Sequence, residues 1–424
     1  MTVGHAPRGI VSRAGLCYAA ATAMPRTIPS LRTVLFRLHW ALGLTAGLVL
    51  ALMGLTGALM SYEEAVTAFA NRDRLTVTAG DRPALAPSAL VARIEAQSGL
   101  TVNVLTLSDD PAASVPIRFA RDPATRERPP AVYADPYDGA VLGPVRLEGA
   151  FATVRDLHRW LLLPGGSKGW GRTITGVCVL ALLAFLGTGL YLRWPKIHRW
   201  RIWLKPSLSR PGRPRWWSLH AVAGTWLMPL YLVMALTGLT WSYPAFKDAA
   251  TWLLVGDTGE AKPARAAGGR ASPGQPVAEA STTPALDSAW AAFRAGEGRE
   301  AGLASVTLPG TDARAIRIRW LPRGVDAPSA RNEARYDPAT GAPLAAEHAA
   351  DTPLGRRIMD NILEVHRGRF FGDLFALLFC LAALALPGFA ATGLTLYVLR
   401  RRAAARRRPA EPRGAAPALS EASR

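Results

Sequence analysis

Charged side chains are missing from four long stretches of this 424-residue chain. Residues 41–60, 173–192, 218–246 and 374–399 contain no Asp, Glu, Lys or Arg. Each stretch has at least 20 residues, and a helix of that length, rising about 1.5 Å per residue, crosses the roughly 30 Å hydrocarbon core of a bilayer. Buried helices of soluble proteins are seldom so long and so free of charge. The pattern therefore predicts four membrane-spanning helices.

Cysteine is also scarce, and its three positions exclude a disulfide scaffold. Cys178 and Cys380 lie inside predicted spans, Cys17 lies near the N-terminus, and none belongs to a CxxC pair. The chain contains no Ser-His-Asp arrangement, HExxH, P-loop or GxGxxG fingerprint in a plausible strand–helix context. No side chain is therefore expected to act as a general acid, a general base or a nucleophile.

Acidic residues are nearly absent from three segments between or beyond the predicted spans. Residues 1–37, 193–217 and 400–424 hold 21 Lys or Arg and two Glu, so they account for the whole net charge of +19. The positive-inside rule places such segments in the cytoplasm. We therefore expect a bacterial inner-membrane protein with both termini cytoplasmic. The basic charge reflects topology and does not predict nucleic-acid binding, although the arginine-rich tail is expected to contact anionic membrane lipid.

The chain resembles itself, which indicates an internal repeat. Placing His39 on His220 aligns the first and third spans without a gap, so that Thr56-Gly57 meets Thr237-Gly238 and Ser61-Tyr62 meets Ser242-Tyr243. Both halves begin in the cytoplasm, which makes the repeats parallel and relates them by a pseudo-two-fold axis along the membrane normal. The predicted fold is a mainly α membrane protein, with a four-helix bundle built from the two repeats.

The repeat continues outside the membrane. Residues 133–142 resemble 335–344, and in both an Asp-Pro followed by Gly marks a turn between extended stretches. Amphipathic helices are predicted at 88–98 and 286–294, and alternating strands at 101–107 and 315–321. Each half is therefore expected to carry a small α+β periplasmic lobe.

These observations predict the domain boundaries, in chain order. We expect a cytoplasmic tail (1–37, in which Met24 is an alternative start to Met1), a first span (38–62), a periplasmic lobe (63–171), a second span (172–193), a basic cytoplasmic loop (194–217), a third span (218–246), a second periplasmic lobe (247–372, with a flexible linker at 256–284), a fourth span (373–399) and a basic cytoplasmic tail (400–424).

Four of the seven histidines occupy matching places in the two halves. His39 and His220 lie at the cytoplasmic ends of the first and third spans, and His158 and His366 lie shortly before the second and fourth. A two-fold axis would bring each pair together, one near each membrane surface. A low-spin haem needs two axial imidazoles on opposite faces of its ring, and helix bundles supply them from facing helices. These four histidines are the predicted axial ligands of haem iron.

Glycines beside the first pair indicate room for a flat ring. Gly43 and Gly47 follow His39 by four and eight residues on one helix face, and Gly224 follows His220 by four. Zinc or copper is the alternative metal, but no Cys or carboxylate accompanies the pairs at metal-site spacing. A purely interfacial role for the histidines stays open. The Thr-Gly pairs favour helix packing. The histidines without repeat partners, interpreted as surface residues, are His5, His198 and His348.

The order and spacing of several short runs resemble the PepSY-associated transmembrane helix proteins over residues 31–402. These runs are Arg37-Leu-His-Trp-Ala-Leu-Gly-Leu, Leu55-Thr-Gly-Ala, Leu157-His-Arg-Trp-Leu, Thr188-Gly-Leu-Tyr-Leu, Leu219-His, Val365-His-Arg-Gly-Arg-Phe-Phe-Gly and Thr392-Gly-Leu. The external Asp-Pro-x-x-Gly units are similar to the PepSY lobes of that family.

The resemblance implies a function in iron uptake, because the family includes iron-regulated inner-membrane proteins and ferric-siderophore reductases that carry b-type haem. It implies an oxidoreductase with two haems b, one haem being the alternative, that reduces a ferric siderophore or another ferric chelate in the periplasm. Some relatives carry a fused flavin reductase domain, which this chain is expected to lack. The electron donor is therefore expected to be a separate cytoplasmic reductase or a quinol.

Two rival functions stay open at this point. A non-enzymatic PepSY protein would bind or regulate a periplasmic partner, with the spans as anchors and the histidines structural; a reducible haem spectrum in purified membranes discriminates the two. A transporter would also fit an internal repeat. However, no predicted span contains a charged residue, and only Pro229 and Pro387 fall well inside predicted helices. Coupled transporters usually have ionisable residues and interrupted helices near the middle of the membrane.

Overall fold

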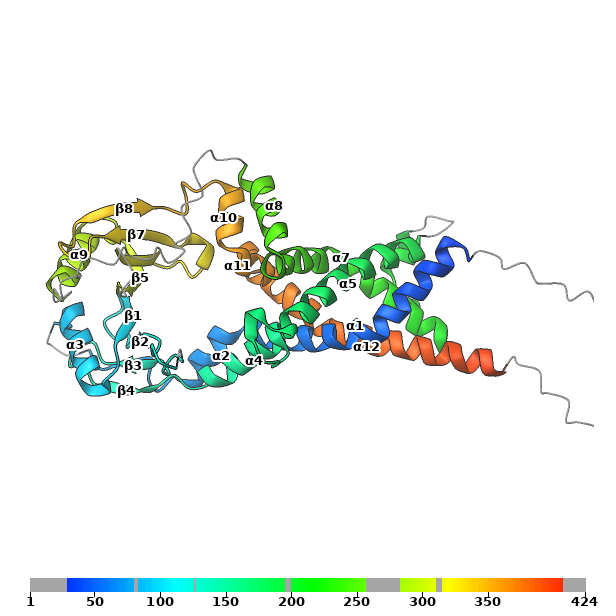
Figure 1. Cartoon of the computed structure of the whole chain (residues 1–424), viewed down its shortest axis with the longest axis horizontal. Helices are drawn as coiled ribbons and strands as arrows, with labels where there is room; N and C mark the ends of the chain where they lie inside the picture. The colour runs from blue at the N-terminus through cyan, green and yellow to red at the C-terminus, as the bar shows by residue number, and fades with distance from the viewer. Residues whose placement is uncertain are drawn as a thin grey trace, which may run out of the picture.

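Four long apolar helices form a bundle, and an antiparallel sheet lies at one end of it (Figure 1). The computed structural model describes residues 29–79, 83–125, 127–194, 200–256, 283–309 and 315–406. Within these residues, the helices long and apolar enough to cross a membrane are α1 (Leu31–Ser61), α5 (Trp170–Arg193), α7 (Arg213–Ser242) and α12 (Asp373–Arg406). The prediction of four spans is confirmed.

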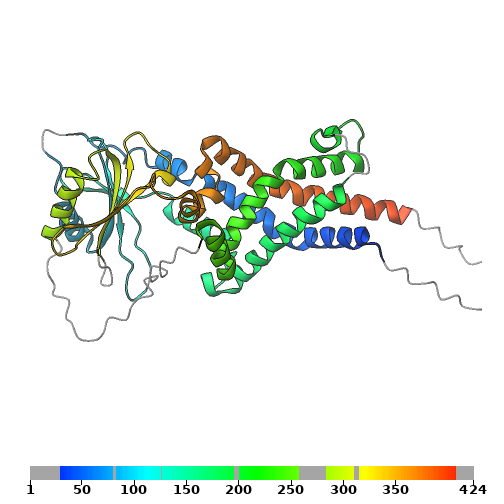
Figure 2. The same cartoon turned by 90° about the horizontal axis from the view of Figure 1, so that it is seen from above.

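Each helix of the bundle packs against two of the other three. Helix α1 packs against both α5 and α12, and α7 also packs against both, so α1 and α7 face each other across the centre. Gly54 allows α1 and α12 to approach closely, since a Cβ at this position would lie 2.4 Å from the carbonyl oxygen of Ala383. The first residues of α1 and the last of α12 lie together at the end of the bundle opposite the sheet (Figure 2). We call this the terminal end and the other the sheet end.

The third span ends earlier than predicted, at Ser242 instead of residue 246. Tyr243 is extended, with φ −129° and ψ 106°, and Pro244 begins a separate helix, α8 (Pro244–Val255). The cause is local, because a proline disfavours the helical conformation of the residue before it and cannot donate the next helical hydrogen bond.

The strands of both halves join in one eight-stranded antiparallel sheet, in the order β4-β3-β2-β1-β5-β6-β7-β8. Their bounds are β1 (Val102–Ser108), β2 (Val115–Phe119), β3 (Val132–Ala134), β4 (Val141–Pro144), β5 (Ala301–Thr307), β6 (Ile316–Pro322), β7 (Asn332–Tyr336) and β8 (Pro343–Glu347). Helices α3 (Pro87–Ser98) and α9 (Thr283–Ala295) lie side by side and pack on the sheet.

This sheet differs from the expected pair of separate lobes. Strands β1 and β5 pair antiparallel, from Val104 opposite Thr307 to Ser108 opposite Leu303. Each half alone would leave one of these strands as an edge with unpaired backbone groups, and the pairing removes both edges. The two halves therefore share one hydrophobic core, in which Leu105 and Ile318 are fully buried.

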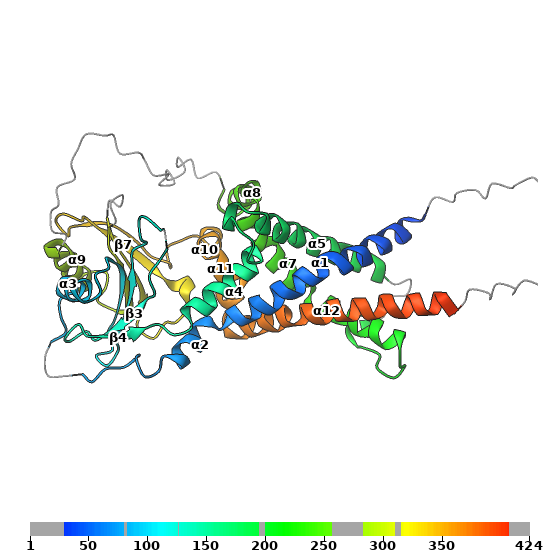
Figure 3. The same cartoon turned by 60° about the horizontal axis from the view of Figure 1, so that its bottom comes forward.

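Short helices connect the sheet to the bundle (Figure 3). These connecting helices are α2 (Glu63–Ala70), α4 (Glu148–Trp160), α10 (Leu354–Asp360) and α11 (Ile362–His366). A further short helix, α6 (Trp200–Leu204), lies at the terminal end. The 3-10 turns of the described residues are η1 (Gly166–Lys168), η2 (Pro328–Ala330) and η3 (Arg369–Phe371). The alternative start at Met24, most of the predicted linker (257–282), and Cys17, His5 and His198 lie outside the described residues.

Candidate functional site

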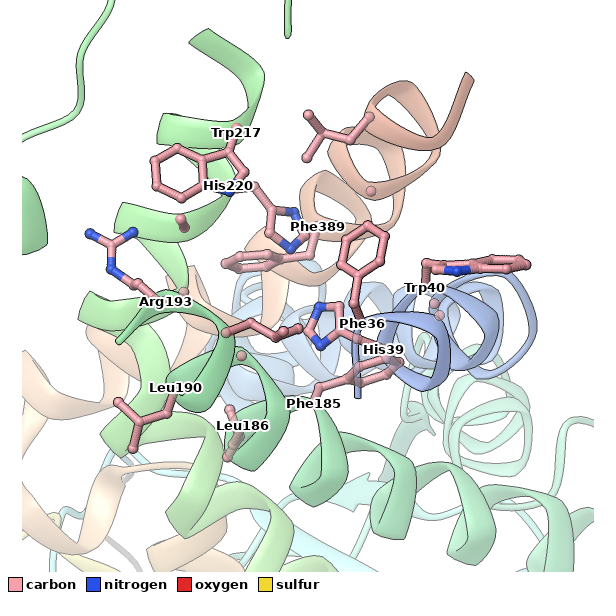
Figure 4. A pocket seen from close by; sticks show the side chains of 18 of the residues that line it. Phe36, His39, Trp40, Phe185, Leu186, Leu190, Arg193, Trp217, His220 and Phe389 are labelled. Atoms are coloured by element: carbon pink, nitrogen blue, oxygen red, sulfur yellow. The ribbon is translucent and has the colours of Figure 1, made fainter. Parts of the chain in front are cut away.

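His39 of α1 and His220 of α7 face each other across the bundle near its terminal end. Their ring centroids are 6.4 Å apart and the ring planes are inclined by 75°. Figure 4 shows both imidazoles projecting into one cavity. The cavity has a volume of about 620 Å³, within the roughly 300–1,000 Å³ typical of cofactor and ligand pockets. The structure thus brings together the first predicted pair.

The cavity walls are mostly apolar, and bare backbone forms part of them. Gly43 and Gly47 line it one and two turns after His39, and a Cβ at either position would meet no atom within 4 Å. Phe185 and Phe389 stand edge-on to the two imidazoles, at 5.3 Å from His39 and 5.1 Å from His220 respectively. Space beside the ligand-type side chains is therefore left open by glycine, as the sequence predicts.

Arginines line the same cavity. They are Arg32, Arg193, Arg213 and Arg400. Nη2 of Arg193 donates to the carbonyls of Ile202 (2.6 Å) and Trp203 (2.9 Å), whereas its Nε and Nη1 are buried and have no hydrogen-bond partner among the described residues. Guanidinium groups are the preferred protein partners of carboxylates. The cavity therefore combines two imidazoles, mostly apolar walls and the side chains of four arginines.

His158 and His366 lie at the sheet end, on α4 and α11. Burial lowers the pKa of His158 to about 4, and burial together with the nearby His158 lowers the pKa of His366 to about 3. Both imidazoles are thus neutral at physiological pH, which is the form whose ring nitrogen can bind a metal. Trp241 stands edge-on to His366, with ring centroids 5.3 Å apart. His158 and His366 therefore lie at the same end of the bundle, near enough for the charge of His158 to lower the pKa of His366.

Each of the four histidines is hydrogen-bonded through Nδ1 to a threonine on a neighbouring helix. The Nδ1–Oγ1 distances are 2.8 Å for His39–Thr188, 2.8 Å for His220–Thr392, 3.0 Å for His158–Thr56 and 2.8 Å for His366–Thr237. The glycine after each threonine faces the Cε1 atom of the same ring. The sequence prediction assigned these Thr-Gly pairs to helix packing and missed their contact with the histidines. One signal was present: every span carries a Thr-Gly pair, although the second span carries two, Thr175-Gly176 and Thr188-Gly189.

The two pairs occupy different levels of the bundle. On α1, His39 and Thr56 are 17 residues apart, and on α7 His220 and Thr237 have the same separation. At about 1.5 Å per residue, the two levels are roughly 25 Å apart along the helices. The sites therefore lie near opposite ends of the membrane-spanning region.

The remaining sequence-predicted positions take no part in these sites. His348 is partly exposed, lies 3.0 Å from Glu297 and packs edge-on to Trp320 in the sheet domain. In the described parts of the chain, no three His, Cys, Asp or Glu side chains gather as a tetrahedral metal site would require. The candidate sites consist of imidazole pairs alone.

Four apolar helices with a sheet at one end define a polytopic membrane protein, and its paired imidazoles face a cavity within the bundle. The chain belongs to the family of PepSY-associated TM regions, which matches residues 36–400. The predicted family is thereby confirmed. A search of curated proteins finds no sequence that matches this chain.

Proposed function

We propose that this protein is a haem-b electron carrier of the bacterial inner membrane that reduces ferric chelates in the periplasm. The observation that carries the proposal is the facing pair His39–His220, with its ring centroids 6.4 Å apart over an apolar cavity. The second pair, His158 and His366, supports a second haem near the sheet. Bound haem would supply one-electron redox chemistry at each level.

The residues fit such a group by three observations. The His39 and His220 rings face one cavity with their centroids 6.4 Å apart, so both imidazoles could reach one metal ion held between them. Gly43 and Gly47 leave open space beside His39 for a planar ring. Arginine side chains line the same cavity, and guanidinium groups are suitable partners for the carboxylates that haem carries on its edge.

The chain's own residues have distinct roles in this proposal. The four imidazoles would hold the iron, the apolar walls would exclude water from the ring, and the arginines would hold its carboxylates. A ferric siderophore as acceptor, and a separate cytoplasmic reductase or a quinol as donor, are supported by the family resemblance.

The proposed orientation is supported by charge. The described residues of the basic segments (29–37, 193–194, 200–217 and 400–406) lie at the terminal end of the bundle, which the positive-inside rule assigns to the cytoplasm. Reporter fusions after Arg210 should therefore read as cytoplasmic and fusions after Ala120 as periplasmic. A periplasmic reading at Arg210 would reverse the direction of electron transfer.

The test is haem quantification with redox titration on the purified chain and on His39→Ala and His158→Ala. Each substitution should remove one of the two imidazoles that would hold haem at one level and leave the spectrum of the other level intact, since the levels are roughly 25 Å apart. Ferric-chelate reduction should fail in both variants. His348→Ala is the matched control and should keep the full haem content. A wild-type chain without haem would contradict the proposal and favour a non-enzymatic PepSY protein that binds a periplasmic partner.

A further inference from the structure

We propose that Thr188, Thr392, Thr56 and Thr237 are positioning residues, which hold the four histidines in the tautomer and orientation that leaves each Nε2 free to bind a metal ion. This inference rests on the proposed function, because the metal it concerns is haem iron. It assigns a role to four side chains that the haem proposal itself does not use.

The first step is the position of the threonine protons. The hydroxyl oxygens of Thr188 and Thr237 lie 2.6 Å from the carbonyl oxygens of Ala184 and Val233, one turn earlier in the same helices. Two oxygen atoms approach this closely only with a proton between them, and a carbonyl has none to give. The hydroxyls therefore donate to the backbone. Thr56 and Thr392 make the same bond at 2.8 Å.

The second step follows for the imidazoles. A threonine hydroxyl has a single proton, so once that proton points to the backbone, the oxygen can only accept from the histidine. Nδ1 of each ring must then carry hydrogen and donate across the 2.8–3.0 Å separation. In a neutral imidazole this leaves the lone pair on Nε2. All four imidazoles therefore have the same tautomer, with hydrogen on Nδ1 and the lone pair on Nε2.

The third step concerns the glycine that follows each threonine. A Cβ at Gly57 would lie 3.2 Å from Cε1 of His158, and one at Gly189 would lie 3.6 Å from Cε1 of His39. At Gly238 and Gly393 the distance to the facing histidine is 3.8 Å. At Gly57 the absence of a Cβ therefore lets the His158 ring approach the helix more closely than alanine would allow, whereas at the other three glycines a Cβ would make ordinary contact with the ring.

Other threonines show that backbone bonding alone does not require this arrangement. Thr395, one turn after Thr392 on α12, bonds the carbonyl of Ala391 at 2.8 Å, and its hydrogen bonds in the described part of the chain include no histidine. Helix structure alone therefore explains why a threonine hydroxyl bonds to the backbone. It does not explain why four such hydroxyls each lie within hydrogen-bonding distance of an imidazole from a different helix.

The effect on a bound metal has a predictable sign. A hydrogen bond from Nδ1–H to an oxygen makes the ring a stronger electron donor and fixes its direction. A stronger donor stabilises ferric iron more than ferrous iron. Loss of the hydroxyl should therefore weaken haem binding at that level. It should also shift the Fe(III)/Fe(II) equilibrium of that haem toward Fe(II), which is measured as a higher midpoint potential.

The experiment compares Thr188→Val, Thr188→Ser and the control Thr395→Val in the full-length purified chain. Valine keeps the branched shape and removes the hydroxyl, whereas serine keeps the hydroxyl. Haem content, visible spectra and dithionite redox titrations are recorded for each variant. We expect Thr188→Val to lose about tenfold in haem affinity at the terminal-end level. Its Fe(III)/Fe(II) equilibrium should shift by up to about tenfold, or 59 mV for one electron.

The controls separate the inference from the proposed function. Thr188→Ser should restore the wild-type potential, Thr395→Val should not change it, and the sheet-end haem should serve as an unperturbed internal reference. If the wild-type chain binds haem and Thr188→Val shows the same affinity and potential, the positioning role is wrong while the haem proposal stands. If the wild-type chain binds no haem, both are overturned.

Discussion

Filling the cavity beside His39 with a larger side chain tests directly whether this cavity binds haem. Gly43 lines the cavity one turn from His39, and a Cβ at this position would meet no protein atom within 4 Å. Gly43→Leu therefore places a side chain into space that the protein itself does not use. Glycine in a helix interior is less favourable than a good helix former by about 0.8–1.0 kcal/mol, so the haem-free variant should be at least as stable as the wild type.

A planar ligand in the same space would meet the new side chain. Inserting extra methylenes into a filled site costs about 1–3 kcal/mol, which corresponds to a roughly 5- to 150-fold loss of affinity. We expect the haem content of Gly43→Leu to fall from two per chain toward one. The spectrum that remains should be that of the sheet-end level.

The assay is haem titration monitored in the visible range, together with thermal unfolding of the haem-free chain. Gly187→Leu is the matched control, because Gly187 is exposed on α5 and a Cβ there also meets no atom within 4 Å. The control should keep both haems. Full haem affinity in a stably folded Gly43→Leu protein would refute the assignment of this cavity to haem.

Two further predictions concern the sheet end. Gly57→Ala brings a methyl group to 3.2 Å from Cε1 of His158, so the haem spectrum of the sheet-end level should change. Gly393→Ala is the control at the terminal-end level. Its methyl group would lie 3.8 Å from Cε1 of His220, so both haem spectra should stay unaltered. Asp287→Ala should lower the free energy of unfolding of the sheet domain by about 1–3 kcal/mol. It removes the carboxylate that accepts from the backbone N–H (2.9 Å) and hydroxyl (2.5 Å) of Ser88; an unchanged melting temperature would contradict this prediction.

The spans and the convergence of the histidines could be predicted from the sequence, because both depend on patterns that repeat along the chain. The absence of charge locates the four helices, as bilayer thickness sets their minimum length. His39 and His220 occupy equal positions in matching spans, so any two-fold arrangement places them opposite each other. The early end of α7 was also readable, since Pro244 follows Tyr243 directly.

The joined sheet and the threonine contacts could not be predicted in the same way. Pairing of β1 with β5 connects residues about 200 positions apart, such as Val104 and Thr307, and each strand alone has the same pattern whether it forms an edge or a centre. The Thr-Gly pairs were ambiguous for a different reason. Small residues serve both close helix packing and ligand support, and only the positions of the Nδ1 atoms distinguish the two.

The β1–β5 ladder also determines how the molecule can deform. Each of its backbone hydrogen bonds contributes about 0.5–1.5 kcal/mol net, so separating the two halves at the sheet costs several such bonds together with the core that they share. The ladder thus ties the halves into a stiff frame at one end, with no hinge between them there. Rocking of one half against the other, on which two-repeat transporters depend, is opposed by this tie. The proposed electron carrier needs no such movement, whereas a transporter does, so the tie between β1 and β5 is consistent with the proposal.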